Sequence, residues 1–144
     1  MAFRFRQGDY VEVTSDEDGF QGAYYTAKVV KPLTSQNQYL VQYQTLLTDD
    51  ESSMLREAVD AIHVRPLPPA IRALEFRAWD EVDVYANDGW WVGRVVGGKE
   101  GMYEVFFDCY ECSIWYGVDE LRIHQEWEYG RWVISDYHKC TRLV

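Results

Sequence analysis

Residues 8–13 read Gly-Asp-Tyr-Val-Glu-Val, and residues 79–84 read Trp-Asp-Glu-Val-Asp-Val. Both stretches alternate apolar and polar side chains, which is the pattern of a half-buried β-strand. The second copy begins about halfway along the chain of 144 residues. This spacing indicates that the chain repeats one structural unit.

Three further blocks recur in the same order after each of these stretches. They are Tyr24–Val30 with Trp90–Val96, Tyr39–Tyr43 with Tyr103–Phe107, and Val59–Val64 with Val118–Ile123. A proline-rich stretch at 65–69 closes the first copy, because proline cannot donate to a β-ladder. We therefore expect a first domain at residues 1–69, a connecting segment at 70–77, and a second domain with an aromatic C-terminal segment at 78–144.

Each copy contains about five short strands, separated by loops that are rich in Gly, Asp, Asn and Ser. A strand set of that size buries its apolar face best by curling into a small barrel. The predicted fold class is all-β, with two tandem five-stranded barrels. Because the connecting segment is short and partly apolar, we expect the two barrels to pack against each other.

The formal net charge is −10, with 24 acidic and 14 basic residues. This balance argues against nucleic acid as the main partner, because phosphate binding needs clustered Lys and Arg. It favours a basic partner, although acidity also serves plain solubility. No apolar run approaches the roughly 20 residues of a membrane span, so we expect no membrane partner.

Catalytic and metal-binding patterns are weak in this chain. The three cysteines include a lone C-x-x-C at Cys109 and Cys112, without a second ligand pair at the spacing of a zinc site. The chain has no nucleophile elbow, phosphate loop or paired His/carboxylate motif. We therefore expect neither an enzyme nor a metal or other cofactor.

A cluster of aromatic residues points to a binding function instead. Residues 102–112 read Met-Tyr-Glu-Val-Phe-Phe-Asp-Cys-Tyr-Glu-Cys and follow a Gly-Trp-Trp at 89–91. A small barrel can bring Trp91, Phe107 and Tyr110 together beside Asp108 and Glu111. Such a box suits a methylated ammonium, which keeps its charge and interacts favourably with ring faces and a carboxylate. The alternative is that these rings are ordinary barrel core.

The repeated blocks resemble a tandem Agenet module, which is a plant Tudor-like module of the royal superfamily. The resemblance rests on Gly8–Val13, Gly19–Val29, Tyr39–Tyr43, His63–Pro66, 88–95, His124–Trp127 and Gly130–Trp132, and extends over nearly the whole chain. It implies two SH3-like barrels and a nuclear, chromatin-associated reader of a methylated histone H3 tail, most often dimethylated at lysine nine. We expect a monomer and no direct contact with nucleic acid.

Carried over position by position, the resemblance places one methyl-lysine cage in each copy. The second copy supplies Trp91, Phe107, Tyr110 and the carboxylate of Asp108, with Tyr85 as a further wall. A possible second cage in the first copy consists of Phe20, Tyr24, Tyr25 and Tyr43. Because the first copy has Leu46 and Gln44 where the second has Tyr110 and Asp108, we favour the second copy as the reader.

Acidic residues near the cages are candidates for holding other basic residues of the tail by charge-assisted hydrogen bonds. These candidates are Asp80, Glu81, Asp83, Glu111, Asp49 and Asp50. The alternative is that they are solvated loop residues, since exposed ion pairs contribute little. Two other functions remain open, namely a scaffold for another basic or methylated ligand and RNA binding through stacked aromatic rings.

Overall fold

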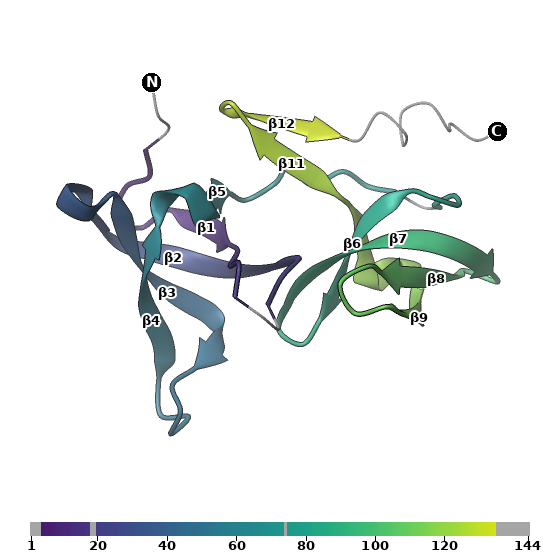
Figure 1. Cartoon of the computed structure of the whole chain (residues 1–144), viewed down its shortest axis with the longest axis horizontal. Helices are drawn as coiled ribbons and strands as arrows, with labels where there is room; N and C mark the ends of the chain where they lie inside the picture. Colours follow the sequence, from purple (N-terminus) through teal and green to yellow (C-terminus); the bar gives the residue numbers. More distant parts are fainter. Residues whose placement is uncertain (1–3, 18–19, 74, 135–144) are drawn as a thin grey trace. The chain divides into compact units, whose positions relative to one another are not determined.

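The computed structural model describes residues 4–17, 20–73 and 75–134, and these residues form mainly β-strands (Figure 1). The prediction of an all-β fold is therefore confirmed. Backbone contacts divide the chain into two compact units, Met1–Leu67 and Pro68–Val144, which we call the first and second unit. In the part of the chain that the structure describes, no helix is long and apolar enough to cross a membrane.

The first unit is an antiparallel sheet of five strands in the order β5-β1-β2-β3-β4. The strands are β1 (Tyr10–Val13), β2 (Ala23–Leu33), β3 (Gln38–Leu47), β4 (Met54–Asp60) and β5 (Val64–Pro66). Single 3-10 turns precede β3 (Thr34–Gln36) and β5 (Ala61–His63). Its core consists of alternate residues of these strands, such as Val11, Val29 and Val41, which are at most 1% exposed.

The second unit repeats this arrangement in the strand order β10-β6-β7-β8-β9. Its strands are β6 (Glu81–Ala86), β7 (Gly89–Lys99), β8 (Met102–Phe107), β9 (Cys112–Gly117) and β10 (Leu121–Ile123), with a 3-10 turn at Val118–Glu120 before β10. A hairpin of β11 (Gln125–Glu128) and β12 (Arg131–Ile134) follows, in which Trp127 faces Trp132 at 5.2 Å between ring centroids.

The segment before the first strand of each unit makes the same contacts in both copies. The backbone N–H of Phe5 donates to the Tyr39 hydroxyl at 3.1 Å, and that of Phe76 donates to the Tyr103 hydroxyl at the same distance. Each phenylalanine ring also meets its tyrosine ring edge-on, at 5.6 and 5.5 Å. Phe76 falls in the predicted connecting segment 70–77, and the structure places it in the core of the second unit.

A buried ion pair joins β1 to β5 in the first unit, and another joins β6 to β10 in the second unit. Arg65 binds Glu12 at 2.8 Å, and Arg122 binds Asp83 at 2.8 Å. Both carboxylates are 1% exposed. Since buried charges need a partner, these pairs fix which residues are equivalent, and Arg65 therefore corresponds to Arg122.

This equivalence corrects one sequence prediction. The sequence comparison aligned His63 with Arg122 in the fourth pair of blocks. In the structure, Glu12 pairs with Arg65 and Asp83 pairs with Arg122, so the residue equivalent to Arg122 lies two positions after His63. The first three pairs of blocks keep the predicted register. Val13 pairs with Tyr25 as Val84 pairs with Trp91, and Lys28 pairs with Gln42 as Arg94 pairs with Phe106.

His124 lies between two carboxylates at the start of the β11–β12 hairpin. Its Nδ1 lies 2.7 Å from Asp83 Oδ1, and its Nε2 contacts Glu126 on the other side. Burial alone would lower the pKa of His124, but hydrogen bonds to Asp83 and Glu126 and the charges of both carboxylates raise it to about 9. The imidazole is therefore protonated at neutral pH and links β6, β10 and β11.

Close packing at Gly93 gives a first testable prediction. A Cβ at this position of β7 would overlap Val105 Cγ1 and lie 3.2 Å from Phe107 Cδ1. Gly93→Ala should therefore lower the free energy of unfolding by about 1–3 kcal/mol, the usual cost of overpacking. Urea unfolding followed by tryptophan fluorescence measures this effect in the second unit, because all six tryptophans lie between Trp79 and Trp132.

Gly117→Ala is the matched control for this experiment. A Cβ at Gly117 would have only Met102 Sδ within contact distance, at 3.8 Å, and its φ of −75° suits alanine. This variant should stay within about 0.5 kcal/mol of the wild type. A Gly93→Ala variant as stable as Gly117→Ala would contradict the prediction.

Candidate functional site

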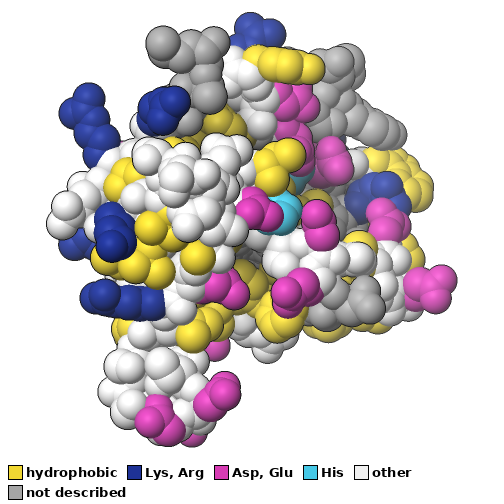
Figure 2. Space-filling model, turned by 60° about the vertical axis from the view of Figure 1, so that its left-hand side comes forward, with side chains coloured by type: hydrophobic (Ala, Val, Ile, Leu, Met, Phe, Trp, Pro, Cys, Tyr) yellow, Lys and Arg dark blue, Asp and Glu magenta, His cyan; other side chains and the backbone are white. Residues whose placement is uncertain are grey.

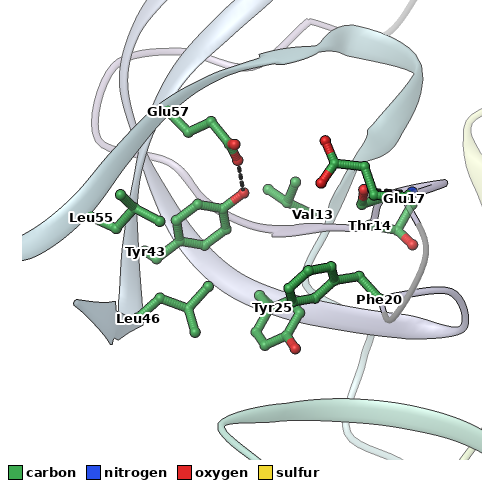
Figure 3. A pocket seen from close by; sticks show the side chains of 10 residues that line it. Val13, Thr14, Glu17, Phe20, Tyr25, Tyr43, Leu46, Leu55 and Glu57 are labelled. Atoms are coloured by element: carbon green, nitrogen blue, oxygen red, sulfur yellow. Dashed lines mark hydrogen bonds between the residues drawn. The ribbon is translucent and has the colours of Figure 1, made fainter. Parts of the chain in front are cut away.

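An aromatic pocket opens in the first unit, between the β3–β4 pair, the start of β2 and the loop that precedes β2 (Figure 3). The cavity has a volume of about 130 Å³. Its walls are Val13, Thr14, Ser15, Glu17, Phe20, Tyr25, Tyr43, Leu46, Leu55 and Glu57. It is smaller than sites for drug-sized ligands or cofactors, and its size suits the end of one side chain.

Three rings form the aromatic part of this pocket. Tyr25 meets Phe20 at 6.4 Å and 65°, and it meets Tyr43 at 6.4 Å and 86° between ring planes. Tyr25 and Tyr43 are held by the strands β2 and β3, whereas Phe20 comes from the loop and is 44% exposed. The near-perpendicular rings give the pocket walls in more than one direction.

Two carboxylates complete the pocket (Figure 3). The Tyr43 hydroxyl donates a 2.6 Å hydrogen bond to Glu57, and Glu17 lies across the cavity in the loop. Burial, then the hydrogen bond and the charge of Glu57, raise the pKa of the Tyr43 hydroxyl far above its ordinary value, so it stays a donor. Because no Lys or Arg lines the pocket, its electrostatic character is negative.

The corresponding aromatic residues of the second unit make different contacts. Trp91 meets Tyr110 edge-on at 5.8 Å, and its indole N–H donates to the carbonyl of Ala86 at 2.7 Å. Phe107 is 7% exposed and belongs to the core, where it packs edge-on against Tyr116. Phe107 is thus part of the core, although burial alone does not distinguish it from Tyr43, which is 5% exposed and reaches the pocket of the first unit through its hydroxyl.

The predicted carboxylate of the second cage is already engaged. Asp108 accepts a 2.8 Å hydrogen bond from Arg94, which neutralises its charge locally. At the position equivalent to Glu57, the second unit has Ile114, because Val41 faces Glu57 and Val105 faces Ile114 in the two registers. The geometry of the described residues thus favours the first unit as the site of the cage, whereas the sequence favoured the second unit.

Two predicted cage walls lie on the opposite face of their strands. Tyr24 stacks on Arg65, with 3.5 Å from Cζ to the ring centroid, and so belongs to the buried ion pair. Tyr85 pairs across the strands with Trp90 and meets its ring at 5.1 Å, whereas Trp91 pairs with Val84. Because side chains alternate along a strand, neither Tyr24 nor Tyr85 reaches its cage.

The acidic candidates separate into buried and exposed residues. Asp80 and Asp83 are 1% exposed and serve the fold, since Asp80 accepts from the backbone of Arg77 and Asp83 binds Arg122 and His124. Glu81 is half-buried opposite Arg94 in β6.

Asp49, Asp50 and Glu111 are exposed in turns. Hydrogen bonds from the side chains of Ser52 and Thr48 lower the pKa of Asp50 to about 2. Asp49, Asp50 and Glu111 are therefore accessible to a binding partner, whereas the buried Asp80 and Asp83 are not.

The cages predicted from the sequence did not include Glu57 or Glu17. Glu57 shares a face of β4 with Leu55 and Val59, so one charged residue interrupts an apolar row, and this irregularity is the signal that identifies it. Glu17 carries no such signal, because its position depends on how the loop before β2 folds back. Among the described residues, no group of three or more His, Cys, Asp or Glu could hold a metal ion.

Comparison with known proteins places the site in a family context. The Agenet domain family model matches residues 8–69. The Arabidopsis thaliana protein AGENET DOMAIN (AGD)-CONTAINING P1 is 40% identical over 89% of this chain, and DUF724 domain-containing protein 3 of the same plant is 38% identical over 93%. This chain spans only 25% and 20% of the length of these two relatives.

Two solved structures resemble the whole described fold. The crystal structure of AGD34 of Arabidopsis thaliana AGDP1 is 39% identical with a TM-score of 0.85, and the match covers 91% of this chain and 90% of that one. The crystal structure of the ADCP1 tandem Agenet domain 3-4 is 34% identical with a TM-score of 0.81, over 91% and 88% of the two chains.

Proposed function

Because this chain belongs to the Agenet domain family, a Tudor-like family of protein-interaction modules, we propose that it is a non-enzymatic reader of a methylated, basic histone tail. In this proposal, the pocket of the first unit holds the methylated lysine. The single observation that supports it is the box of Phe20, Tyr25 and Tyr43 with the carboxylates of Glu57 and Glu17.

The chemistry of this box fits a methylammonium group. Methyl groups remove N–H donors and spread the positive charge, so the group loses less hydration when it enters a ring-lined cavity. Three rings attract the cation through their faces, and Glu57 and Glu17 supply the opposite charge. Such contacts contribute about 2 kcal/mol when the cation is desolvated, which corresponds to roughly 30-fold in affinity.

The proposal extends to the architecture and the partner. Each unit is one SH3-like Agenet barrel, and the two form a tandem, like the tandem Agenet domain 3-4 of ADCP1. The proposed partner is the N-terminal tail of histone H3 dimethylated at lysine nine. A histone partner implies a nuclear protein, and we propose that it acts as a monomer. The net charge of −10 supports a basic tail as partner.

Peptide titration tests this function and locates the site. Wild-type protein should bind an H3 tail peptide that is dimethylated at lysine nine more tightly than the unmodified peptide. Tyr25→Ala should remove most of this preference, by roughly 30-fold, because one wall of the box is lost. Glu57→Gln keeps the shape and removes a charge, so it should weaken binding without unfolding the unit.

Tyr110→Ala is the matched control, since Tyr110 belongs to the second unit and is 42% exposed. This variant should keep the methyl preference. A preference lost with Tyr110→Ala and retained with Tyr25→Ala and Glu57→Gln would move the site to the second unit. Equal affinity of the wild type for both peptides would contradict the reader function and leave a scaffold for another basic ligand.

A further inference from the structure

The first unit carries a group of basic side chains on the face of its sheet that points away from the pocket. Lys28, Lys31, Arg56 and Tyr10 are exposed there beside the half-buried Gln42, and we call these five residues the basic face. Arg56 and Glu57 are neighbours on β4 and point to opposite sides, as do Gln42 and Tyr43 on β3. The pocket and the basic face therefore occupy the two sides of one sheet.

The strand registers align four of these residues in one row. Tyr10 pairs with Lys28, Lys28 with Gln42, and Gln42 with Arg56. Adjacent strands lie about 4.8 Å apart, so the row extends over roughly 14 Å from β1 to β4. Within it, Lys28 Nζ lies 5.6 Å from the centre of the Tyr10 ring, and Arg56 donates a 2.9 Å hydrogen bond to Gln42.

A β-bulge adds Lys31 to this face. Residues three apart on a regular strand point to opposite sides, so Lys28 and Lys31 would be separated. The register between β2 and β3 shifts between Val29 and Lys31, and Lys31 then faces Leu40, which lies on the same side as Gln42. The irregularity therefore brings a second lysine beside the row.

These positive charges are not neutralised within the protein. Among the described residues, none of Lys28, Lys31 and Arg56 forms an ion pair. By contrast, Arg65, Arg94 and Arg122 each bind a carboxylate. Figure 2 shows several Lys and Arg side chains gathered at the left of the view, whereas Asp and Glu lie mainly toward its centre, right and bottom. The basic face is thus locally positive, although the net charge of the chain is −10.

The second unit shows that the fold does not require this face. The registers place Glu81, Arg94, Phe106 and Ser113 where the first unit has Tyr10, Lys28, Gln42 and Arg56. Gly97 replaces Lys31 after the same bulge, and Arg94 is paired with Asp108. The second unit therefore does not repeat the row of cations at the equivalent positions.

We propose that the basic face binds the phosphate backbone of a nucleic acid. Three cations that form no ion pair among the described residues lie on one sheet surface, and direct ion pairs between them and phosphates would release counterions. Tyr10 is 50% exposed at the end of the row and offers a ring on which an unstacked base can lie. An acidic peptide would use the cations but not this ring, so the arrangement favours nucleic acid.

Fluorescence anisotropy with a labelled 20-nucleotide single strand and the matching duplex tests this inference on the full chain. Contact with about three phosphates predicts that duplex binding weakens ~40-fold as salt rises from about 50 to about 200 mM. The variant Lys28→Ala/Lys31→Ala/Arg56→Ala should lose this binding and its salt dependence. Tyr10→Ala should weaken binding of the single strand but not of the duplex.

The matched control is Arg72→Ala/Lys99→Ala/Arg131→Ala, which removes the same number of exposed cations from the second unit. It should bind nucleic acid as the wild type does. An equal loss in both triple variants, no binding at about 50 mM salt, or equally effective competition by polyglutamate would each overturn the proposal. Because the pocket faces the other way, the first triple variant should keep its affinity for the methylated peptide.

Discussion

Asp83→Ala is expected to lower the free energy of unfolding of the second unit by about 3–5 kcal/mol, the cost of leaving buried cations without a partner. Asp83 is 1% exposed and binds both Arg122 and protonated His124. Its removal leaves two positive charges close together in a poorly hydrated place. Urea unfolding with tryptophan fluorescence detects the change, and Trp90, which stacks on Arg122 at 4.1 Å, reports on this cluster directly.

Asp119→Ala removes the same charge from an exposed turn and serves as the control. It should change stability by less than about 0.5 kcal/mol. If Asp83→Ala were no less stable than Asp119→Ala, the ion pairs would not be what holds β6 to β10. Glu12→Ala should reproduce the effect in the first unit, where Arg65 is the buried partner.

Raising the pH should destabilise the second unit through His124. The folded pKa of about 9 lies above the unfolded value of 6.5, so the protonated form stabilises the fold. The contribution is complete below pH 6.5 and is lost as the pH rises from 6.5 to about 9. This difference corresponds to a loss on the order of 3 kcal/mol. Urea midpoints measured from pH 6 to pH 9 give the profile.

His124→Gln should flatten this profile, because it removes the titrating group. Glu126→Gln is a milder variant, since it removes one of the two charges that raise the pKa and keeps the imidazole bound to Asp83. It should shift the loss of stability to lower pH. A wild-type midpoint that does not change between pH 6.5 and pH 9 would contradict the assignment.

The duplicated fold could be predicted because its signals are local. Val11, Glu12 and Val13 recur as Val82, Asp83 and Val84, and the four valines are buried as the alternation predicts. Glu12 and Asp83 are buried as well, because each binds an arginine of a neighbouring strand. The fourth block was misaligned by two residues because side chains alternate with a period of two along a strand. A shift of two residues therefore keeps every side chain on the same face, and the apolar pattern cannot reveal it. The pairs Arg65–Glu12 and Arg122–Asp83 resolve it, and they join residues far apart in the sequence.

The site was only partly predictable for a related reason. Tyr25 and Tyr43 could be found because each occupies the same position as an aromatic residue in the other copy. Whether such rings line a pocket or fill the core depends on contacts between distant segments. Phe20 comes from a loop and Glu57 from β4, and together they turn the rings of the first unit into a box. In the second unit, Arg94 binds Asp108, and no spacing rule foresees that pair.

The contact of Phe76 with Tyr103 has a practical consequence for anyone who wishes to study the second unit in isolation. A shortened chain that starts at residue 78, where the repeat first becomes readable, would lack the phenylalanine that covers one end of its core. It would also leave the Tyr103 hydroxyl without the amide that binds it. Such a fragment should start before Ala73, which packs against the same core.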